Sequence, residues 1–364
     1  MKEIAETLLA WRRDGIRFAL ATVVATWKSA PRQPGAAMAV AESGEVVGSV
    51  SGGCVEGALY ELALEVIESG EPRLAHYGVS DDEAFGVGLT CGGMLDVLVV
   101  PVDDHSYPEF AELAAAVVAG KPIAVATVTG GLPEIGGRLV VTDAGTAGTL
   151  GRVRRDAAIA ELARGMLASG RTGTVRTGLD GRRREDDLSV FVQSFSPPPR
   201  MLVFGAIDFA AAVTRIGKFL GYHVTVCDAR PVFATAKRFP DADEVVVDWP
   251  HRYLATAHVD ERTAICVLTH DPKFDVPLLT LAVRTPARYI GVMGSRRTHE
   301  DRNARLRAEG VTEAELARLS SPIGLDLCAR TPEETAVAIA AEIIALTWGG
   351  TGARLSTITE AIHR

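Results

Sequence analysis

Short apolar stretches recur along this chain, and their spacing differs between its two halves. Up to about residue 194, apolar residues gather in strand-like runs such as 17–27, 36–41 and 94–102, with few helical periods between them. After residue 200, β-branched apolar runs alternate with segments of helical period, which is typical of a parallel sheet covered on both faces. The pattern predicts an α/β protein in which a mixed N-terminal domain precedes a Rossmann-like, doubly wound parallel sheet.

The second half predicts a regular succession of strands and helices. Strands are expected at 200–205, 223–229, 243–248, 263–270 and 288–295, with one helix ending near 221, a short one after the second strand, and others starting near Phe274 and Arg296. The last helix begins at TPEE, where Thr331 is the N-cap, Pro332 occupies the first turn and Glu334 completes a capping box.

Three consecutive prolines mark the clearest boundary in the chain. They stand in FSPPPR, residues 195–200, and consecutive prolines form a stiff, extended spacer. We therefore expect an N-terminal domain over 1–194, a proline-rich linker over 195–200, a Rossmann-like domain over 201–348 and a C-terminal tail over 349–364.

The N-terminal domain contains a weak internal repeat. The runs at 19–27, 36–50 and 95–100 recur in the same order at 123–129, 137–150 and 188–193, as expected of a duplicated scaffold. The second copy lacks two features of the first. SGGCVEG at 51–57 is replaced by GRVRRDA, and nothing corresponds to TCGG at 90–93. These two cysteine loops are therefore expected to be additions to a fold that forms without them.

Composition excludes several classes of protein. The 364 residues are 47% hydrophobic and carry a net charge of −8, so nucleic acid is not an expected partner. The most apolar late segment, 335–350, contains Glu342 and is shorter than the ~20 residues that span a bilayer, so no membrane is expected. Five scattered cysteines are unlike a disulfide framework, which favours a reducing cytoplasm.

The loop SGGCVEG places a thiol in front of a predicted helix. Gly52 and Gly53 let the backbone approach a ligand closely and leave outward-facing N–H groups, which is the arrangement of an anion site. Cys54 stands at that site, where a helix N-terminus favours the thiolate. Glu56 either complements the helix dipole or contributes to the site.

A second cysteine has a similar setting. Cys91 precedes Gly92 and Gly93 and then a strand, so Cys54 and Cys91 are the candidates for functional thiols. The alternative is that both are small buried residues beside tight turns. The sequence shows no paired cysteine spacing, which argues against a structural zinc. His76, on a strand between the two loops, could protonate a ligand or simply be accommodated there.

The Rossmann-like half carries an incomplete dinucleotide fingerprint. Gly205 provides the tight turn and Ala210 can replace the last glycine, but Ile207 occupies the position where the backbone must approach a pyrophosphate. Asp228 at the end of the second strand suits ribose hydroxyls, and Arg230 could instead receive a 2′-phosphate. Binding of NAD(P) is therefore expected to be poor.

Further candidates lie where the carboxyl ends of the parallel strands should meet. THD at 269–271 ends a strand beside the expected switch point of the sheet, and GSRR at 294–297 opens a helix. The residues concerned are Thr269, His270, Asp271, Gly294, Ser295 and Arg296. Alternatively, His270 and Asp271 only cap the next helix and the arginines face solvent.

These motifs together resemble one family. GSVSGGCVEG, GLTCGG, VLTHD, YIGVMGSRR and SPIGLDL are similar to those of the XdhC/CoxI family over nearly the whole chain. The resemblance implies a maturation factor that binds the molybdenum cofactor (molybdopterin), protects it while its terminal sulfur is installed, and passes it to a molybdenum hydroxylase of the xanthine dehydrogenase or carbon monoxide dehydrogenase type. It also implies that the loops around Cys54 and Cys91 hold a pterin phosphate or the sulfur-bearing face of the metal.

Two other functions stay open on the residues alone. One is an NAD(P)-dependent oxidoreductase that uses the Rossmann-like domain, and the other is a sulfur-transfer protein that carries a persulfide on Cys54 or Cys91. The leading hypothesis is a cofactor binding and delivery factor with no turnover of its own. Its expected partners are an apo molybdenum hydroxylase and a cysteine desulfurase, and we expect the protein to be a homo-oligomer.

Overall fold

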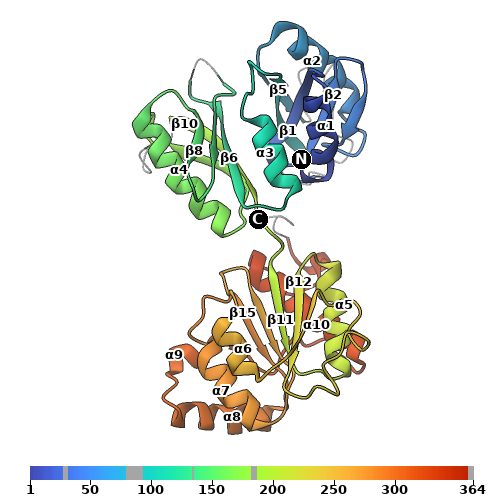
Figure 1. Cartoon of the computed structure of the whole chain (residues 1–364), viewed down its shortest axis with the longest axis vertical. Helices are drawn as coiled ribbons and strands as arrows, with labels where there is room; N and C mark the ends of the chain where they lie inside the picture. Colours follow the sequence, from blue (N-terminus) through green and yellow to red (C-terminus); the bar gives the residue numbers. More distant parts are fainter. Residues whose placement is uncertain (28–31, 79–92, 133–134, 182–186, 360–364) are drawn as a thin grey trace. The chain divides into compact units, whose positions relative to one another are not determined.

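The structure is a computed structural model of the chain, and it describes residues 1–27, 32–78, 93–132, 135–181 and 187–359. Two compact units are present, one built on Met1–Pro197 and the other on Pro198–Thr359 (Figure 1). The division falls between two of the three consecutive prolines.

The first half of the N-terminal unit is a five-stranded antiparallel sheet in the order β3-β2-β1-β5-β4. Its elements are η1 (Lys2–Ile4), α1 (Ala5–Arg13), β1 (Phe18–Trp27), β2 (Ala37–Ala41), β3 (Val46–Gly48), α2 (Glu56–Ser69), β4 (Arg73–Tyr77) and β5 (Met94–Val102). Helix α2 covers one face of this sheet, where Leu59, Ala63 and Val66 enter a core with inward side chains of β1 and β5.

The second half repeats this arrangement. Its sheet has the order β8-β7-β6-β10-β9, which is the order of the first sheet with each strand replaced by its counterpart. Its elements are α3 (Phe110–Val118), β6 (Ile123–Gly130), β7 (Arg138–Val141), β8 (Thr146–Thr149), α4 (Val153–Ala168), β9 (Gly173–Thr177) and β10 (Leu188–Phe195). Helix α4 covers one face of the second sheet as α2 covers one face of the first. The predicted internal duplication is therefore confirmed.

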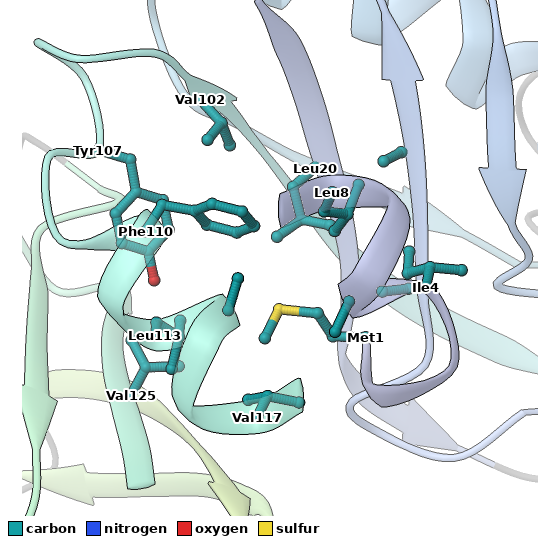
Figure 2. Packing of buried hydrophobic residues seen from close by; sticks show 14 of the residues in the cluster. Met1, Ile4, Leu8, Leu20, Val102, Tyr107, Phe110, Leu113, Val117 and Val125 are labelled. Carbon is teal, nitrogen blue, oxygen red and sulfur yellow. The ribbon is translucent and has the colours of Figure 1, made fainter. Parts of the chain in front are cut away.

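The two halves share a core in which α1 and α3 take part. Figure 2 shows Phe110 and Val117 of α3 on one side of this core and Leu8 of α1 on the other. Side chains from both sheets, such as Leu20 of β1 and Val125 of β6, belong to the same cluster. Because each half buries one face of its sheet in this core, neither half is a separate body.

The second unit is a six-stranded parallel sheet in the order β13-β12-β11-β14-β15-β16, as predicted for a Rossmann-like domain. Its strands are β11 (Arg200–Phe204), β12 (His223–Asp228), β13 (Glu244–Val247), β14 (Ala264–Val267), β15 (Tyr289–Val292) and β16 (Leu319–Ser320). Its helices are α5 (Asp208–Phe219), α6 (Pro250–Thr256), α7 (Pro272–Ala282), α8 (Arg296–Ala308), α9 (Glu313–Leu316), α10 (Pro332–Trp348) and η2 (Leu355–Thr357).

Helices cover both faces of this sheet. Helices α5 and α10 pack on one face, and α6 to α9 pack on the other (Figure 1). The capping box of the last helix is confirmed, because the Thr331 hydroxyl accepts from the Glu334 N–H and the Glu334 carboxylate accepts from the Thr331 N–H. The short helix predicted after β12 is wrong, since residues 229–243 form turns. The two-residue strand β16 was too short to predict.

Candidate functional site

The Cys54 loop connects β3 to α2 in the first half of the N-terminal unit. Gly52 and Gly53 have φ angles of +79° and +120°, a region that residues with a Cβ rarely adopt. A Cβ built on either glycine meets no other atom of the described residues within 4 Å. The glycines are therefore required by the backbone path, and no atom of the described residues occupies the position of a Cβ beside them.

The Glu56 carboxylate lies at the centre of this loop and accepts seven hydrogen bonds. The donors are the hydroxyls of Ser49 and Ser51 and the N–H groups of Val50, Ser51, Gly52, Gly53 and Val55, at distances from 2.5 to 3.3 Å. Burial acts to raise the pKa of Glu56, but the hydrogen bonds from Ser51 and Ser49 outweigh it and hold the pKa far below its usual range. The prediction of outward-facing amides is therefore wrong, because the carboxylate of the same loop already receives them.

The second half of the unit has an equivalent carboxylate that accepts fewer hydrogen bonds. Asp156, a hundred residues after Glu56, accepts from the Thr149 hydroxyl and the Leu150 N–H, both at 2.7 Å. Ser49 and Val50 make the equivalent bonds to Glu56 in the first half. A carboxylate at this position thus belongs to the duplicated scaffold.

The two halves differ in where the helix begins. Helix α4 starts at Val153, three residues before Asp156, whereas α2 starts at Glu56 itself. The first turn of helix in the second half is therefore replaced in the first half by the loop that carries Gly52, Gly53 and Cys54. This confirms, for the Cys54 loop, that the fold forms in one half without it.

Cys54 is half-buried at the margin of the core beneath α2, rather than fully buried as the structural alternative requires. Its N–H donates to the Ser51 hydroxyl at 3.0 Å. Cys91 and Gly92 lie outside the described residues, and Gly93 is buried directly before β5. Whether Cys54 and Cys91 share one site therefore stays a prediction.

A histidine–aspartate pair lies on two neighbouring strands of the same sheet. His76 of β4 is opposite Asp96 of β5 in register, and the His76 Nδ1 atom is 2.6 Å from Asp96 Oδ1. His76 is exposed and Asp96 is largely buried. Sequence reasoning considered His76 alone, because the pairing depends on a strand register that alternating patterns do not fix to the residue.

In the second unit, the predicted residues lie at or just after the carboxyl ends of parallel strands, which meet at one edge of the sheet. Gly205 follows β11 with φ +107°, and a Cβ there would lie 2.9 Å from Thr269 Cγ2. The loops after β11 and β14 are therefore in contact. Arg230, after β12, lies within electrostatic range of Asp271, after β14.

Asp228 is almost fully buried, and neighbouring groups of the protein already donate hydrogen bonds to its carboxylate. Its oxygens accept from the Ala206 N–H at 2.8 Å, from the Arg230 N–H and Nε at 2.9 Å, and from Arg230 Nη2 at 2.8 Å. Burial acts to raise the pKa of Asp228, but these bonds lower it. Asp228 therefore fixes the loop before α5, and Ile207, the N-cap residue of α5, packs against the core with part of its side chain.

The residues after β14 and β15 mainly organise helices. Asp271 accepts from the Lys273 N–H at 3.1 Å and pairs with Lys273 Nζ at 2.9 Å, so the capping interpretation is confirmed for Asp271. Ser295 caps α8 by accepting from the Thr298 N–H at 3.2 Å. Of the remaining candidates, Gly294 precedes this cap, and His270 and Arg296 are exposed.

Sequence reasoning missed a buried network behind this edge. Thr269 donates to Asp275, and Asp275 is 3.3 Å from Arg302, whose Nη2 also donates to the Met293 carbonyl at 2.8 Å. Asp275 and Arg302 are both almost fully buried. Burial raises the pKa of Asp275, although its hydrogen bond to Thr269 and the charge of Arg302 oppose that shift. The network joins the loops after β14 and β15, and only the fold brings its members together.

Two family models match this chain. The model of the XdhC Rossmann domain matches residues 201–343, and the model of the XdhC and CoxI family matches residues 11–78 and 116–178. Together they reach both units and both halves of the first. The chain belongs to the XdhC/CoxI family.

Relatives of this XdhC/CoxI chain cover most of its length. A protein of Bacillus subtilis (strain 168) that is named as a probable subunit of xanthine dehydrogenase is 27% identical over 327 residues, which are 89% of this chain and 92% of the relative. The "Molybdenum cofactor insertion chaperone PaoD" of Escherichia coli (strain K12) is 26% identical over 324 residues, which are 89% and 81% of the two chains. A crystal structure described as a xanthine dehydrogenase from Bacillus halodurans is 27% identical, covers 98% of each chain and gives a TM-score of 0.67.

Two features are absent from the described part of this XdhC/CoxI chain. Among its residues, no group of three or more histidine, cysteine, aspartate or glutamate side chains could hold a metal ion. Among its helices, none is long and apolar enough to cross a membrane.

Proposed function

We propose that the protein binds the molybdenum cofactor and delivers it to an apo molybdenum hydroxylase of the xanthine dehydrogenase or carbon monoxide dehydrogenase type. Membership of the XdhC/CoxI family supports this, as do relatives named as a molybdenum cofactor insertion chaperone and as part of a xanthine dehydrogenase. The observation that carries the proposal is the asymmetry of the duplicated unit. One half begins its helix directly, and the other replaces the first turn by an open glycine loop with a half-buried thiol.

The chemistry of the loop suits a soft ligand better than a phosphate. The backbone amides that would bind phosphate donate to Glu56, so the group of this loop that we assign to a guest is the half-buried Cys54 sulfur. Sulfur is a soft donor, and molybdenum bound by a dithiolene is a soft centre. We therefore assign Cys54 to the metal-bearing face of the cofactor, which is the cargo of the protein, and Cys91 stays its predicted partner.

Delivery of the cofactor to another enzyme also implies a source of sulfur and a place of action. A cysteine desulfurase would supply the terminal sulfur before transfer, and the protein would act in the cytoplasm without turnover of its own. The pterin phosphate needs donors outside the Cys54 loop. Arg230 and Arg296 stay predicted anion-binding residues within the second unit alone, because guanidinium groups bind phosphate well.

The test is the cofactor content of protein purified from cells that make the cofactor. We expect about one pterin and one molybdenum per chain, measured by fluorescence of the oxidised pterin and by elemental analysis. Cys54→Ala and Cys91→Ala should each lower retention by about tenfold or more, because loss of even a group that only supports a metal ligand costs roughly 10–100-fold at other metal sites. Cys328→Ala is the matched control, because Cys328 is exposed in the second unit.

Three results would contradict the proposal. Equal pterin in all four proteins would remove the two cysteines from the site. A persulfide on Cys54 in protein that contains no pterin would support sulfur transfer instead. Micromolar binding of NAD or NADP by protein that contains no pterin would support the oxidoreductase alternative.

A further inference from the structure

The second unit exposes an apolar surface along α10 and beside the end of α5. Val337, Ile344 and Trp348 follow one another at spacings of seven and four residues, so they form one stripe on the outer side of α10. Phe219 at the end of α5 is 84% exposed and Trp348 is 79% exposed. With Leu327 in the loop before α10, these five residues form what we call the α5–α10 face. Large apolar groups gathered in this way mark interaction sites.

The α5–α10 face is uneven in shape as well as apolar. A hollow of about 290 Å³ lies between α5 and α10 and is lined by Ile216, Phe219 and Val337. A second hollow of about 320 Å³ lies between α10 and the loop that contains Leu327 and Cys328. Val337 lines both, so the α10 stripe forms a ridge with a hollow on either side. Ridges and grooves of this kind interlock when two helical surfaces pack.

The charges around the face balance. At its edge, Arg215 pairs with Glu333 at 3.0 Å, and Arg330 stands near Glu334, whose carboxylate accepts from the Arg330 N–H at 2.7 Å. Two positive and two negative groups therefore border an uncharged centre. The chain as a whole carries a net charge of −8, so two copies repel each other at long range. Contact through this neutral face avoids that repulsion.

We propose that a second copy of this chain covers the α5–α10 face, with α10 of one copy packed against α10 of the other about a twofold axis. Such an isologous contact needs a surface that complements itself, and a ridge between two hollows with balanced edge charges does so. Each buried aromatic side chain contributes roughly 150 Å² or more, so the two aromatics supply more than a third of the roughly 800 Å² per partner of a standard interface. The three half-exposed aliphatic residues and the walls of the two hollows add to that area.

The test is the mass of the full-length protein in solution, measured by light scattering and sedimentation equilibrium at micromolar concentration. Wild type should have about twice the 38.5 kDa of one chain. Val337→Glu should weaken association by about 100-fold or more, because a twofold axis places the two new carboxylates close together. Val232→Glu is the matched control, since Val232 is 73% exposed in the same unit but outside the face, and it should stay dimeric.

A charge-swap experiment makes the test specific to this face. Val337→Glu and Val337→Lys should each be monomeric alone, and an equimolar mixture should form a dimer. Circular dichroism of each variant checks that it is folded. A monomeric wild type would overturn the proposal, because the face would then be covered by another protein or by another part of the chain. A dimeric Val337→Glu variant would also overturn it, because the contact would then lie elsewhere.

Discussion

Replacing Glu56 by Gln should disorder the Cys54 loop, whereas replacing Asp156 by Asn should leave its own half of the unit nearly unchanged. The two substitutions remove the same charge from equivalent positions of a duplicated scaffold. In Glu56, one carboxylate oxygen accepts four hydrogen bonds and the other accepts three. Glutamine keeps one accepting oxygen and turns an NH₂ group toward donors, so at least three bonds lose their acceptor.

The expected magnitudes follow from these counts. Because the loop is partly exposed, water replaces some of the lost bonds, and we expect Glu56→Gln to lower the free energy of unfolding of the N-terminal unit by about 2–4 kcal/mol. Asparagine at position 156 can still accept from the Leu150 N–H, and its NH₂ group can donate to the Thr149 hydroxyl. Asp156→Asn should therefore cost about 0.5–1 kcal/mol.

Hydrogen exchange measures the protection of the loop amides directly, and urea unfolding measures the free energy of unfolding. Amides 50–55 should lose protection in Glu56→Gln, whereas amides 150–151 of the second half should keep theirs in Asp156→Asn. The low pKa of Glu56 in the folded protein adds a pH test. A carboxylate whose folded pKa is depressed stabilises the fold above its unfolded pKa of about 4.3, and that stabilisation is lost as the pH falls below this value. Wild type should thus lose stability below about pH 4 more steeply than Glu56→Gln. Equal protection of these amides in wild type and Glu56→Gln would refute the reasoning.

Three further predictions concern single residues. Gly205→Ala should lower the free energy of unfolding of the second unit by about 2–4 kcal/mol in urea, because Gly205 has a positive φ and its Cβ would lie 2.9 Å from a threonine methyl. Gly221→Ala, at a position with positive φ but no close contact, should cost about 1 kcal/mol. Burial raises the pKa of Cys266 to about 12, so its alkylation between pH 6 and 9, followed by peptide mass, should be slower than that of Cys54; the reverse order would contradict this. Calorimetric titration should show poor NAD and NADP binding by wild type and improved binding, with NAD preferred, by Ile207→Gly; micromolar binding by wild type would show that Ile207 does not obstruct the loop.

The spacing of apolar residues predicted helices and strands well where burial alone determines them. The run at 94–102 is β5 to the residue, and the capping box at Thr331 lies where its pattern placed it. Both signals are local, since an apolar run and a hydroxyl–carboxylate spacing act within a few residues. The short helix expected after β12 failed because that segment, which contains Pro231 and Pro240, forms successive turns that no local pattern distinguished from a helix.

The partners of the site residues could not be predicted in the same way. Which group receives the amides of the Cys54 loop depends on how Glu56 turns back from α2, and the partners of Asp275 come from separate parts of the second unit. One signal was present in the sequence and went unused. A hydroxyl residue stands seven positions before a carboxylate at both Ser49–Glu56 and Thr149–Asp156, and the repeat makes that spacing a prediction of shared structure.

The duplication also explains why a costly loop persists. A helix that loses its first turn loses backbone hydrogen bonds, and two glycines with positive φ add conformational entropy to the unfolded chain. The second half avoids both costs by starting α4 at Val153. The first half accepts them and recovers part of the loss through the seven hydrogen bonds to Glu56. Because the same fold is available without this loop, stability does not account for it. The feature that the replacement adds is a half-buried Cys54 beside two glycines with positive φ, which fits the cofactor-carrying role proposed above.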